Sequence, residues 1–240
     1  MAGRPEGGSL RETFTGFYEN WHIKHQEILE KLIECVENEE EEDQDHQCQE
    51  EIFNQVLSHY QEFFQEKSKA ANEDVFLVIS APWFSSFERA LIWVSAFRPS
   101  MLFSLIKNSI GEDLGHDQQV KIEAIKVETK REEKAIEEEF AKVQESVADS
   151  GIFPLLRRFE RIIDGEISEL DNAMEELKKG MIMVVEEADV LRGLTVKKLM
   201  EVLNPIQNLK FLIAAVQFVA RARTWGLYKD SIIITTTRDD

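Results

Sequence analysis

Apolar residues recur at intervals of three, four and seven positions along most of the chain, which is the spacing of amphipathic helices. Two such stripes come first, over Leu10–Val36 and over Ile52–Asn72. Between them, Glu39–Asp45 holds six acids in seven positions and no apolar residue. Because a block of like charges repels itself, we expect a solvated acidic linker over 37–51.

The segment after the second stripe carries clear helix boundaries. The run Asp74–Ser80 fits a strand or a buried helix, and we favour a helix because no second strand candidate lies nearby. Pro82 ends this helix, since proline lacks the backbone N–H and restricts the residue before it. Ser85 or Ser86 is placed to cap the next helix, with Glu88 positioned to close a capping box from Ser85.

A central, buried helix is predicted over Phe87–Phe97, because apolar residues cover nearly its whole circumference. Arg98 and Pro99 break it, and Met101–Ile110 then forms a further short apolar helix.

The second half of the chain predicts longer helices. Residues 117–147 form a charged helix with a thin apolar seam, which lies on the outside of a bundle or faces a partner. The next helix opens at Pro154 and either breaks at Gly180 or continues through it to Leu203.

The last helix has a strong start signal. Asn204 serves as its N-cap and Pro205 as its first helical residue, and we expect the helix to end at Gly226. The residues beyond it, 229–240, are expected to form a flexible tail.

These elements predict an all-α fold, a single bundle of roughly seven to nine helices with no significant sheet. Eleven glycines and five prolines in 240 residues are too few for a protein built on many tight turns. The helical domain is expected over 10–228, after a disordered N-terminus over 1–9.

Acidic residues outnumber basic ones 46 to 28, which gives a formal net charge of −18. Such a surface repels phosphates and anionic lipid headgroups, so we expect no direct nucleic-acid partner. We also expect no membrane span, because the longest nearly apolar run, Phe211–Ala220, is too short to cross a bilayer. With two cysteines and no signal peptide, we expect the protein in the nucleus and cytoplasm.

Candidate chemistry is sparse. Glu19-x-x-His22 has the spacing of a metal-ligand pair on one helix face, but a second such motif is missing, so we predict no metal and no cofactor. His22 and His25 are expected at the surface of an amphipathic helix, and Cys35 in the core. Since no catalytic motif is visible, we predict no catalytic residues and no enzymatic activity.

Several blocks stand out in order along residues 10–228: Phe14 to Trp21, His59-Tyr60-x-x-Phe63-Phe64-x-x-Lys67, Trp83-x-x-x-x-Glu88-Arg89-x-x-x-Trp93-x-x-x-Phe97-Arg98-Pro99, Ala188-Asp189-x-Leu191-Arg192, and Arg221-x-Arg223. Together they resemble the plant seed-dormancy-control (delay-of-germination) domain, which also forms the C-terminal part of TGA-type bZIP transcription factors. One departure is Val94-Ser95-Ala96, where many relatives carry a Gly-Gly pair. We therefore expect a more regular helix end here.

The resemblance implies a non-catalytic regulatory protein that contacts signalling or transcription-related proteins. It implies roles in seed dormancy, in abscisic-acid or stress responses, or in development such as pollen-aperture formation. No basic region is expected before the first helix, so sequence-specific DNA reading by this chain is not expected. Some relatives bind haem through histidines near the C-terminus, and this chain has no histidine after His116.

The core signature expected from these blocks comprises Trp21, Tyr60, Trp83, Glu88, Trp93, Arg98 and Pro99. Glu88 and Arg98 flank an apolar segment, and an unpaired buried charge is costly. Each should therefore find a charged or backbone partner, which could be the other. We favour an internal clamp over an interaction surface for this pair, because tryptophans belong in cores.

The candidate interaction residues are Asp189, Arg192, Arg221 and Arg223, together with the seam of 117–147. Arg223 could instead form a purely structural salt bridge to Asp189. The charged long helix permits a homo- or heterodimer without requiring one. The rival interpretation is a small-molecule sensor that holds haem or an apolar ligand within the bundle.

Overall fold

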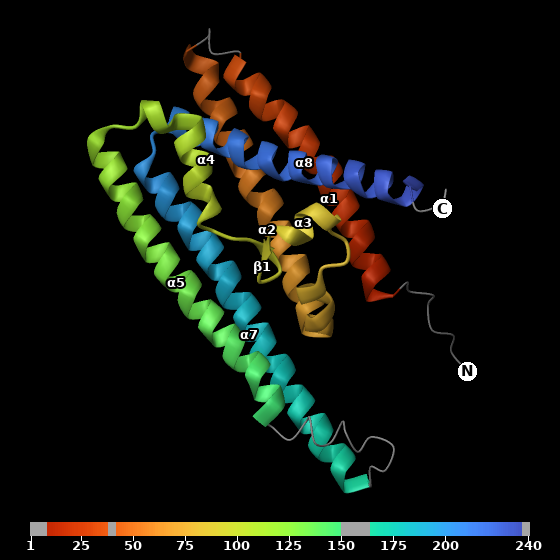
Figure 1. Cartoon of the computed structure of the whole chain (residues 1–240). Helices are drawn as coiled ribbons and strands as arrows, with labels where there is room; N and C mark the ends of the chain where they lie inside the picture. Colours follow the sequence, from red (N-terminus) through yellow and green to blue (C-terminus); the bar gives the residue numbers. More distant parts are fainter. Residues whose placement is uncertain (1–8, 38–41, 150–163, 237–240) are drawn as a thin grey trace.

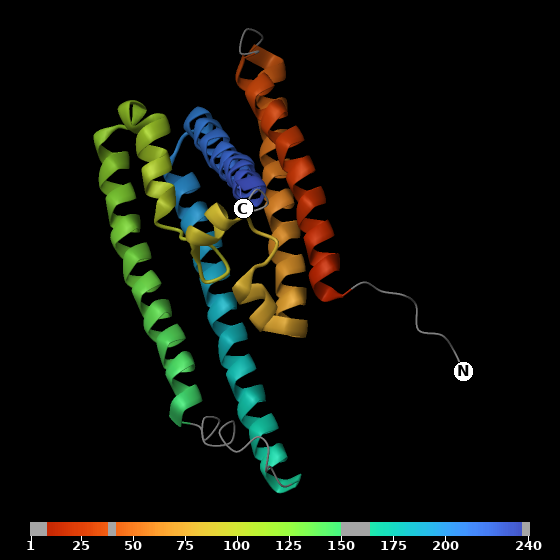
Figure 2. The same cartoon turned by 45° about the vertical axis from the view of Figure 1, so that its right-hand side comes forward.

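The computed structural model describes residues 9–37, 42–149 and 164–236, and nearly all of them are helical. Two long helix pairs run side by side, α1 (Leu10–Glu37) with α2 (Glu42–Ser80) and α5 (His116–Asp149) with α7 (Asp164–Val202), and α8 (Pro205–Thr236) crosses them (Figures 1 and 2). The short elements between α2 and α5 are α3 (Ser86–Ala90), β1 (Ile92–Trp93), β2 (Ala96–Phe97), α4 (Met101–Ile110) and the 3₁₀ helix η1 (Gly111–Asp113). The predicted all-α class is confirmed.

Three apolar clusters hold these helices together. The largest joins α1, α2, the segment between α2 and α4, and the facing halves of α5 and α7, and it buries Trp21, Trp83 and Trp93. A second cluster joins α1, α2 and α8, and a third joins α4, α5, α7 and α8. Tyr60 packs against both the first and the second cluster. Because α8 shares clusters with both pairs, it fixes one pair relative to the other.

Two helix starts are confirmed in atomic detail. Ser85 Oγ accepts from the Glu88 backbone N–H, and Glu88 Oε2 accepts from the Ser85 backbone N–H at 2.8 Å, which is a complete capping box. At the start of α8, Asn204 Oδ1 accepts from the backbone N–H of Gln207 at 2.9 Å. In turn, Gln207 Oε1 accepts from the Asn204 backbone N–H at 3.0 Å. Both starts were predicted because capping is local chemistry.

The acidic stretch corrects the sequence prediction in part. Helix α2 begins at Glu42, so the expected linker over 37–51 is helical from that residue onward. Residues 38–41 lie outside the described part, as do residues 1–8 and the expected helix start at Pro154. The helix favoured over Asp74–Ser80 is confirmed; it follows the longer part of α2 across a kink where Asp74 has φ −148° and ψ 93°.

The end of the last helix was predicted wrongly. Helix α8 continues past Gly226 to Thr236, so the described part of the expected tail is helical. Gly226 is present for a different reason, which is close packing. A Cβ at this position would lie 2.0 Å from Ser85 Oγ and 2.8 Å from Ser85 Cβ. Only glycine lets α8 approach the start of α3 so closely.

Candidate functional site

The central helix predicted over Phe87–Phe97 is also wrong, because the chain instead forms the short helix α3 followed by a β-hairpin. Ile92 pairs with Phe97 and Trp93 with Ala96, which leaves Val94 and Ser95 as a two-residue loop. Both loop residues have positive φ, 43° and 64°. Positive φ at both positions is the geometry that hairpin turns favour, and it costs a β-branched residue about 1–2 kcal/mol. The expected regular helix end at Val94-Ser95-Ala96 therefore does not exist.

Arg192 holds this strained loop in place from helix α7. Its guanidinium donates to the carbonyl oxygens of Trp93, Val94 and Phe97, with Nη2 at 3.0 Å from Val94 O and Nε at 2.8 Å from Phe97 O. Its Nη1 pairs with Asp189 Oδ1 at 2.6 Å. Arg192 is 7% exposed, so this predicted interaction residue is an internal one.

Lys67 completes the same network from helix α2. Its Nζ donates to Asp189 Oδ1 at 2.6 Å and to Ser95 Oγ at 3.1 Å, and the side chain is fully buried. Burial lowers the pKa of Lys67 to about 8, although the Asp189 carboxylate opposes that shift. Asp189 therefore pairs with two cations inside the bundle and is not a free surface carboxylate.

Glu88 forms a second internal network. Its carboxylate accepts from Tyr18 Oη at 2.9 Å, from Ser85 Oγ at 2.6 Å and from Arg223 Nη1 at 3.2 Å, and it is 0% exposed. Arg223 Nη1 also donates to the Trp83 carbonyl at 2.7 Å. Burial, together with the Glu88 carboxylate, raises the pKa of Tyr18 well above its usual range, so its hydroxyl stays a donor. Arg223 is thus a structural partner of Glu88, and the alternative pairing with Asp189 is wrong.

Arg98 does not pair with Glu88, although both find the charged partners that the burial argument requires. Arg98 pairs with Glu137 and Glu133 of α5, and its guanidinium lies 5.4 Å from the centre of the Trp93 ring. Glu133 is 2% exposed and also accepts from the Ser100 backbone N–H at 2.7 Å, directly after the buried Pro99. Glu133 and Glu137 of α5 therefore bind the chain that leaves the hairpin.

The histidines were placed wrongly at the surface. His25 is 0% exposed, with Nε2 at 3.0 Å from the Val216 carbonyl oxygen and Nδ1 at 3.1 Å from His59 Nε2. Trp21 stacks on the His59 ring and donates to the His59 carbonyl oxygen at 3.0 Å. Burial lowers the pKa of His22 and His59 to about 3 and that of His25 to about 4, so all three are neutral at pH 7.

No sequence signal marked this histidine cluster, because its members come from two helices, α1 and α2, that meet only in the folded bundle. Among the described residues, no three histidine, cysteine or acidic side chains converge as a metal-binding group. Both ring nitrogens of His25 are engaged in hydrogen bonds. His25 is therefore held by hydrogen bonds on both sides of its ring.

In contrast to these buried networks, a groove of about 670 Å³ between α5 and α7 is open at the surface. The predicted α5 seam is buried against α7, where Ile122, Thr129 and Ile136 are 3–8% exposed, so the seam itself is no free surface. Beside it, α7 leaves Met183, Val190 and Leu194 exposed at 48–60%. The groove is lined by these three residues and by Glu128, Thr129, Glu132, Ala135, Ile136, Glu186, Glu187, Leu191, Thr195 and Lys198.

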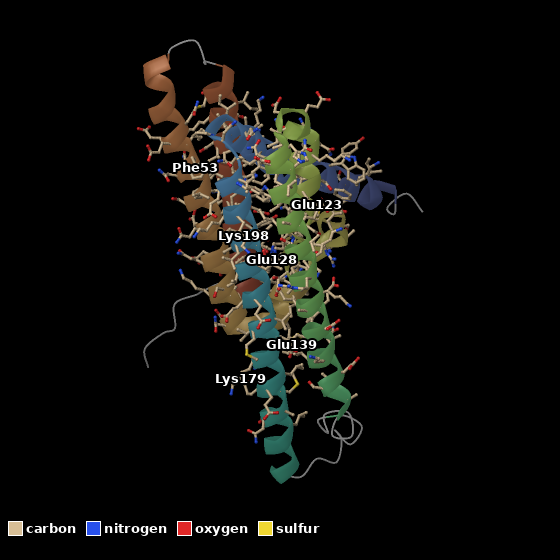
Figure 3. All side chains as sticks on the ribbon, turned by 90° about the vertical axis from the view of Figure 1, so that its left-hand side faces the viewer. Phe53, Glu123, Glu128, Glu139, Lys179 and Lys198 are labelled. Atoms are coloured by element: carbon tan, nitrogen blue, oxygen red, sulfur yellow. The ribbon has the colours of Figure 1, made fainter. Side chains whose placement is uncertain are left out.

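Charge around the groove is mainly negative. Four glutamates line it and one lysine, Lys198, stands at one end, where it pairs with Glu128 at 2.7 Å (Figure 3). Elsewhere, Arg221 is exposed on α8, while Arg223 two residues later points inward. Sequence reasoning missed the groove because its apolar wall depends on which face of α7 is left uncovered.

Comparison with known proteins places these features in a family context. A family model described as seed dormancy control matches residues 26–108, a span that holds Lys67, Glu88 and the hairpin. Protein ZW2 of Arabidopsis thaliana is 37% identical over 230 residues, covering 91% of this chain and 98% of the relative. Protein RESPONSE TO ABA AND SALT 1 of the same plant is 36% identical over 221 residues, covering 90% of this chain and 95% of the relative.

The chain is also similar to a DNA-binding protein. The TGACG-sequence-specific DNA-binding protein TGA-2.1 of Nicotiana tabacum is 27% identical over 216 residues, which covers 88% of this chain but 45% of the relative. The similarity thus spans nearly all of this chain and less than half of that longer protein. Within the described residues, no helix combines the length and apolarity needed to cross a bilayer.

Proposed function

Because the chain belongs to the seed dormancy control family, we propose that this plant regulatory protein acts by binding other proteins, with the α5–α7 groove as a contact surface. The polar clusters that could have suggested chemistry, around Glu88 and around Asp189, are internal, and both carboxylates are held by several hydrogen bonds. We therefore propose a non-catalytic function in which the buried networks are scaffold.

The observation that supports the groove is its apolar row beside a negative rim. Met183, Val190 and Leu194 follow one another at steps of seven and four, so they form one continuous face of α7. An amphipathic helix laid into a groove presents anchors at the same spacing. Since Glu186 and Glu187 add negative charge on the same helix, the partner is proposed to be an amphipathic helix with basic flanks.

A pair of matched variants tests the groove. Val190→Asp/Leu194→Asp places two charges on the proposed contact face, while Val120→Asp/Val127→Asp places two charges at exposed valines of α5 that do not line the groove. Affinity capture from seed and pollen tissue, with cross-linking and mass spectrometry, should lose a set of proteins with the first variant and keep it with the second. The cross-linked segments should be basic and helical.

The opposite result is equally clear. If the groove variant captures the same proteins as the unaltered chain, or if the cross-links to α7 fall on acidic segments, the groove is not the contact surface. Circular dichroism of both variants must match the unaltered chain, because a folding defect would remove contacts everywhere.

We further propose that this regulation concerns transcription in the nucleus, in seed dormancy, abscisic-acid or stress responses, or development. The similarity to TGA-2.1 and the name of RESPONSE TO ABA AND SALT 1 support this assignment. With a net charge of −18, the chain is not expected to hold DNA by itself. A gel shift on TGACG-containing DNA at moderate salt, with and without a TGA protein, tests both statements. Binding by the chain alone would contradict the second.

A further inference from the structure

The last turns of α8 carry two opposite faces. Arg223, Gly226 and Asp230, spaced by three and four residues, face the start of α3. Arg221, Trp225, Tyr228 and Lys229 follow at steps of four, three and one, which places them together on the other side of the helix. All four are exposed, Trp225 at 48% and Tyr228 at 60%. We call these four residues the α8 outer face.

The inner contacts hold this face rigid. The Ser86 backbone N–H donates to Asp230 Oδ2 at 3.0 Å, and Gly226 brings the α8 backbone directly against Ser85. The Phe87 ring meets the Trp225 ring edge-on, with 4.5 Å between ring centres. Since the helix is anchored on α3, little conformational freedom remains to be lost when a partner binds the outer face.

The outer face is also positively charged in a protein that is otherwise acidic. Lys229 Nζ lies 5.3 Å from the centre of the Trp225 ring and 5.9 Å from that of Tyr228. Within residues 9–37, 42–149 and 164–236, neither Arg221 nor Lys229 takes part in an ion pair. Several exposed lysines elsewhere, such as Lys24, Lys69 and Lys142, instead lie beside a carboxylate.

We propose that the α8 outer face binds an acidic segment of a partner protein that carries apolar anchor residues. Tryptophan, tyrosine and arginine are the residue types that supply most binding energy in interfaces. The two unpaired cations select carboxylates, and the exposed rings accept apolar side chains. Because screening limits charge effects to about 8 Å at physiological salt, these local cations outweigh the distant negative charge.

A nucleic acid is the weaker candidate for the same face. Aromatic and basic residues together also bind single-stranded nucleic acid, by stacking and by phosphate contacts. However, two cations neutralise few phosphates, which leaves a strand little electrostatic affinity for this face. The proposed partner chemistry is also opposite to that of the α5–α7 groove, so the two surfaces would take different partners.

The test uses a fluorescent peptide of alternating acidic and large apolar residues, with a counterpart in which lysine replaces every acid. Fluorescence anisotropy is measured on the full chain and on Arg221→Glu/Lys229→Glu. The matched control, Lys121→Glu/Lys130→Glu on α5, changes the net charge equally at exposed lysines away from the face. We expect Arg221→Glu/Lys229→Glu to lower the affinity for the acidic peptide about tenfold or more, and the control to leave that affinity unchanged.

Tyr228→Ala should lower the affinity for the acidic peptide without changing the net charge, because it removes an exposed ring from the face. Equal weakening by both double variants would overturn the proposal, since it would reduce the effect to overall charge. Tighter binding of the lysine peptide or of oligo-dT at this face would overturn it as well. So would a dimer in analytical ultracentrifugation that Arg221→Glu/Lys229→Glu dissociates, because a second copy would then occupy the face.

Discussion

Glycine at position 226 gives the sharpest test of how α8 is held. Replacing a glycine inside a helix by alanine normally stabilises it, by about 1 kcal/mol. At Gly226, however, the new Cβ would meet Ser85 Oγ at 2.0 Å, Ser85 Cβ at 2.8 Å and Phe87 Cβ at 3.3 Å. Distances below 3 Å cannot exist between these atoms, so α8 or α3 must move.

The Ser85 side chain cannot simply turn aside, because it serves the capping box and donates to Glu88 Oε2 at 2.6 Å. Each such hydrogen bond contributes about 1 kcal/mol, and overpacking a close contact costs typically about 1–3 kcal/mol. We therefore expect Gly226→Ala to lose about 1–3 kcal/mol of unfolding free energy after the helix-propensity gain is subtracted.

Gly193 is the matched control, since it lies inside α7 and a Cβ there would meet nothing within 4 Å. Gly193→Ala should gain up to about 1 kcal/mol, so the two substitutions should differ in sign. Urea unfolding measures both, and for a chain of this size about 1 kcal/mol moves the melting temperature by about 2–4 °C. Equal stability of the two variants would refute the close packing of α8 against Ser85.

Two further predictions concern the buried polar groups. Glu88→Gln keeps the shape of the side chain but removes the charge opposite Arg223, so urea unfolding should show a loss of about 3 kcal/mol; an unchanged midpoint would contradict the internal clamp. His22, His25 and His59 have folded pKa values of about 3, 4 and 3, below their usual 6.5, so the unfolded chain takes up more protons below pH 6.5. The contribution of these neutral histidines to the free energy of unfolding is complete above pH 6.5 and is lost as the pH falls toward 4. At pH 5 the loss should already be about 1–2 kcal/mol for each histidine. A constant unfolding free energy between pH 7 and pH 5 would contradict it.

The long helices and their starts could be predicted because their signals are local. The period of apolar residues gave α1, α5 and much of α2, and the capping residues at Ser85 and Asn204 mark helix starts within a few positions. None of these elements depends on a distant partner for its type.

Three of the errors involve partners far away in the chain. The hairpin exists because Arg192, nearly a hundred residues later, binds three of its carbonyl oxygens. His25 is buried because Val216 offers a carbonyl oxygen across the bundle. Gly226 lies inside a helix rather than after its end, and glycine is needed there because α3 packs directly against it. An apolar run or a lone glycine looks the same in sequence whether or not such a partner is present.

The network around Asp189 allows one last prediction, in which two cations that look alike should behave differently. Lys67→Met removes a charge whose burial is already unfavourable, as its lowered pKa shows, and Arg192 still neutralises Asp189. Ser95 Oγ loses its donor, and Asp189 Oδ1 keeps the one from Arg192. We expect a change within about 1 kcal/mol, because a buried charge replaced by a well-packed apolar side chain is often neutral.

Arg192→Met should instead cost about 3–5 kcal/mol, because it leaves the carbonyl oxygens of Trp93, Val94 and Phe97 without their donor in a strained loop. A pH series separates the two effects. The folded pKa of Lys67, about 8, lies below its usual 10.5, so between these values the unfolded chain binds more protons and stability rises with pH. Subtracting the Lys67→Met curve from that of the unaltered chain should show this rise between pH 8 and pH 10. A difference curve that stays flat would mean that Lys67 is not buried as a charged group beside Asp189. A loss of less than about 1 kcal/mol for Arg192→Met would mean that the hairpin does not depend on the guanidinium.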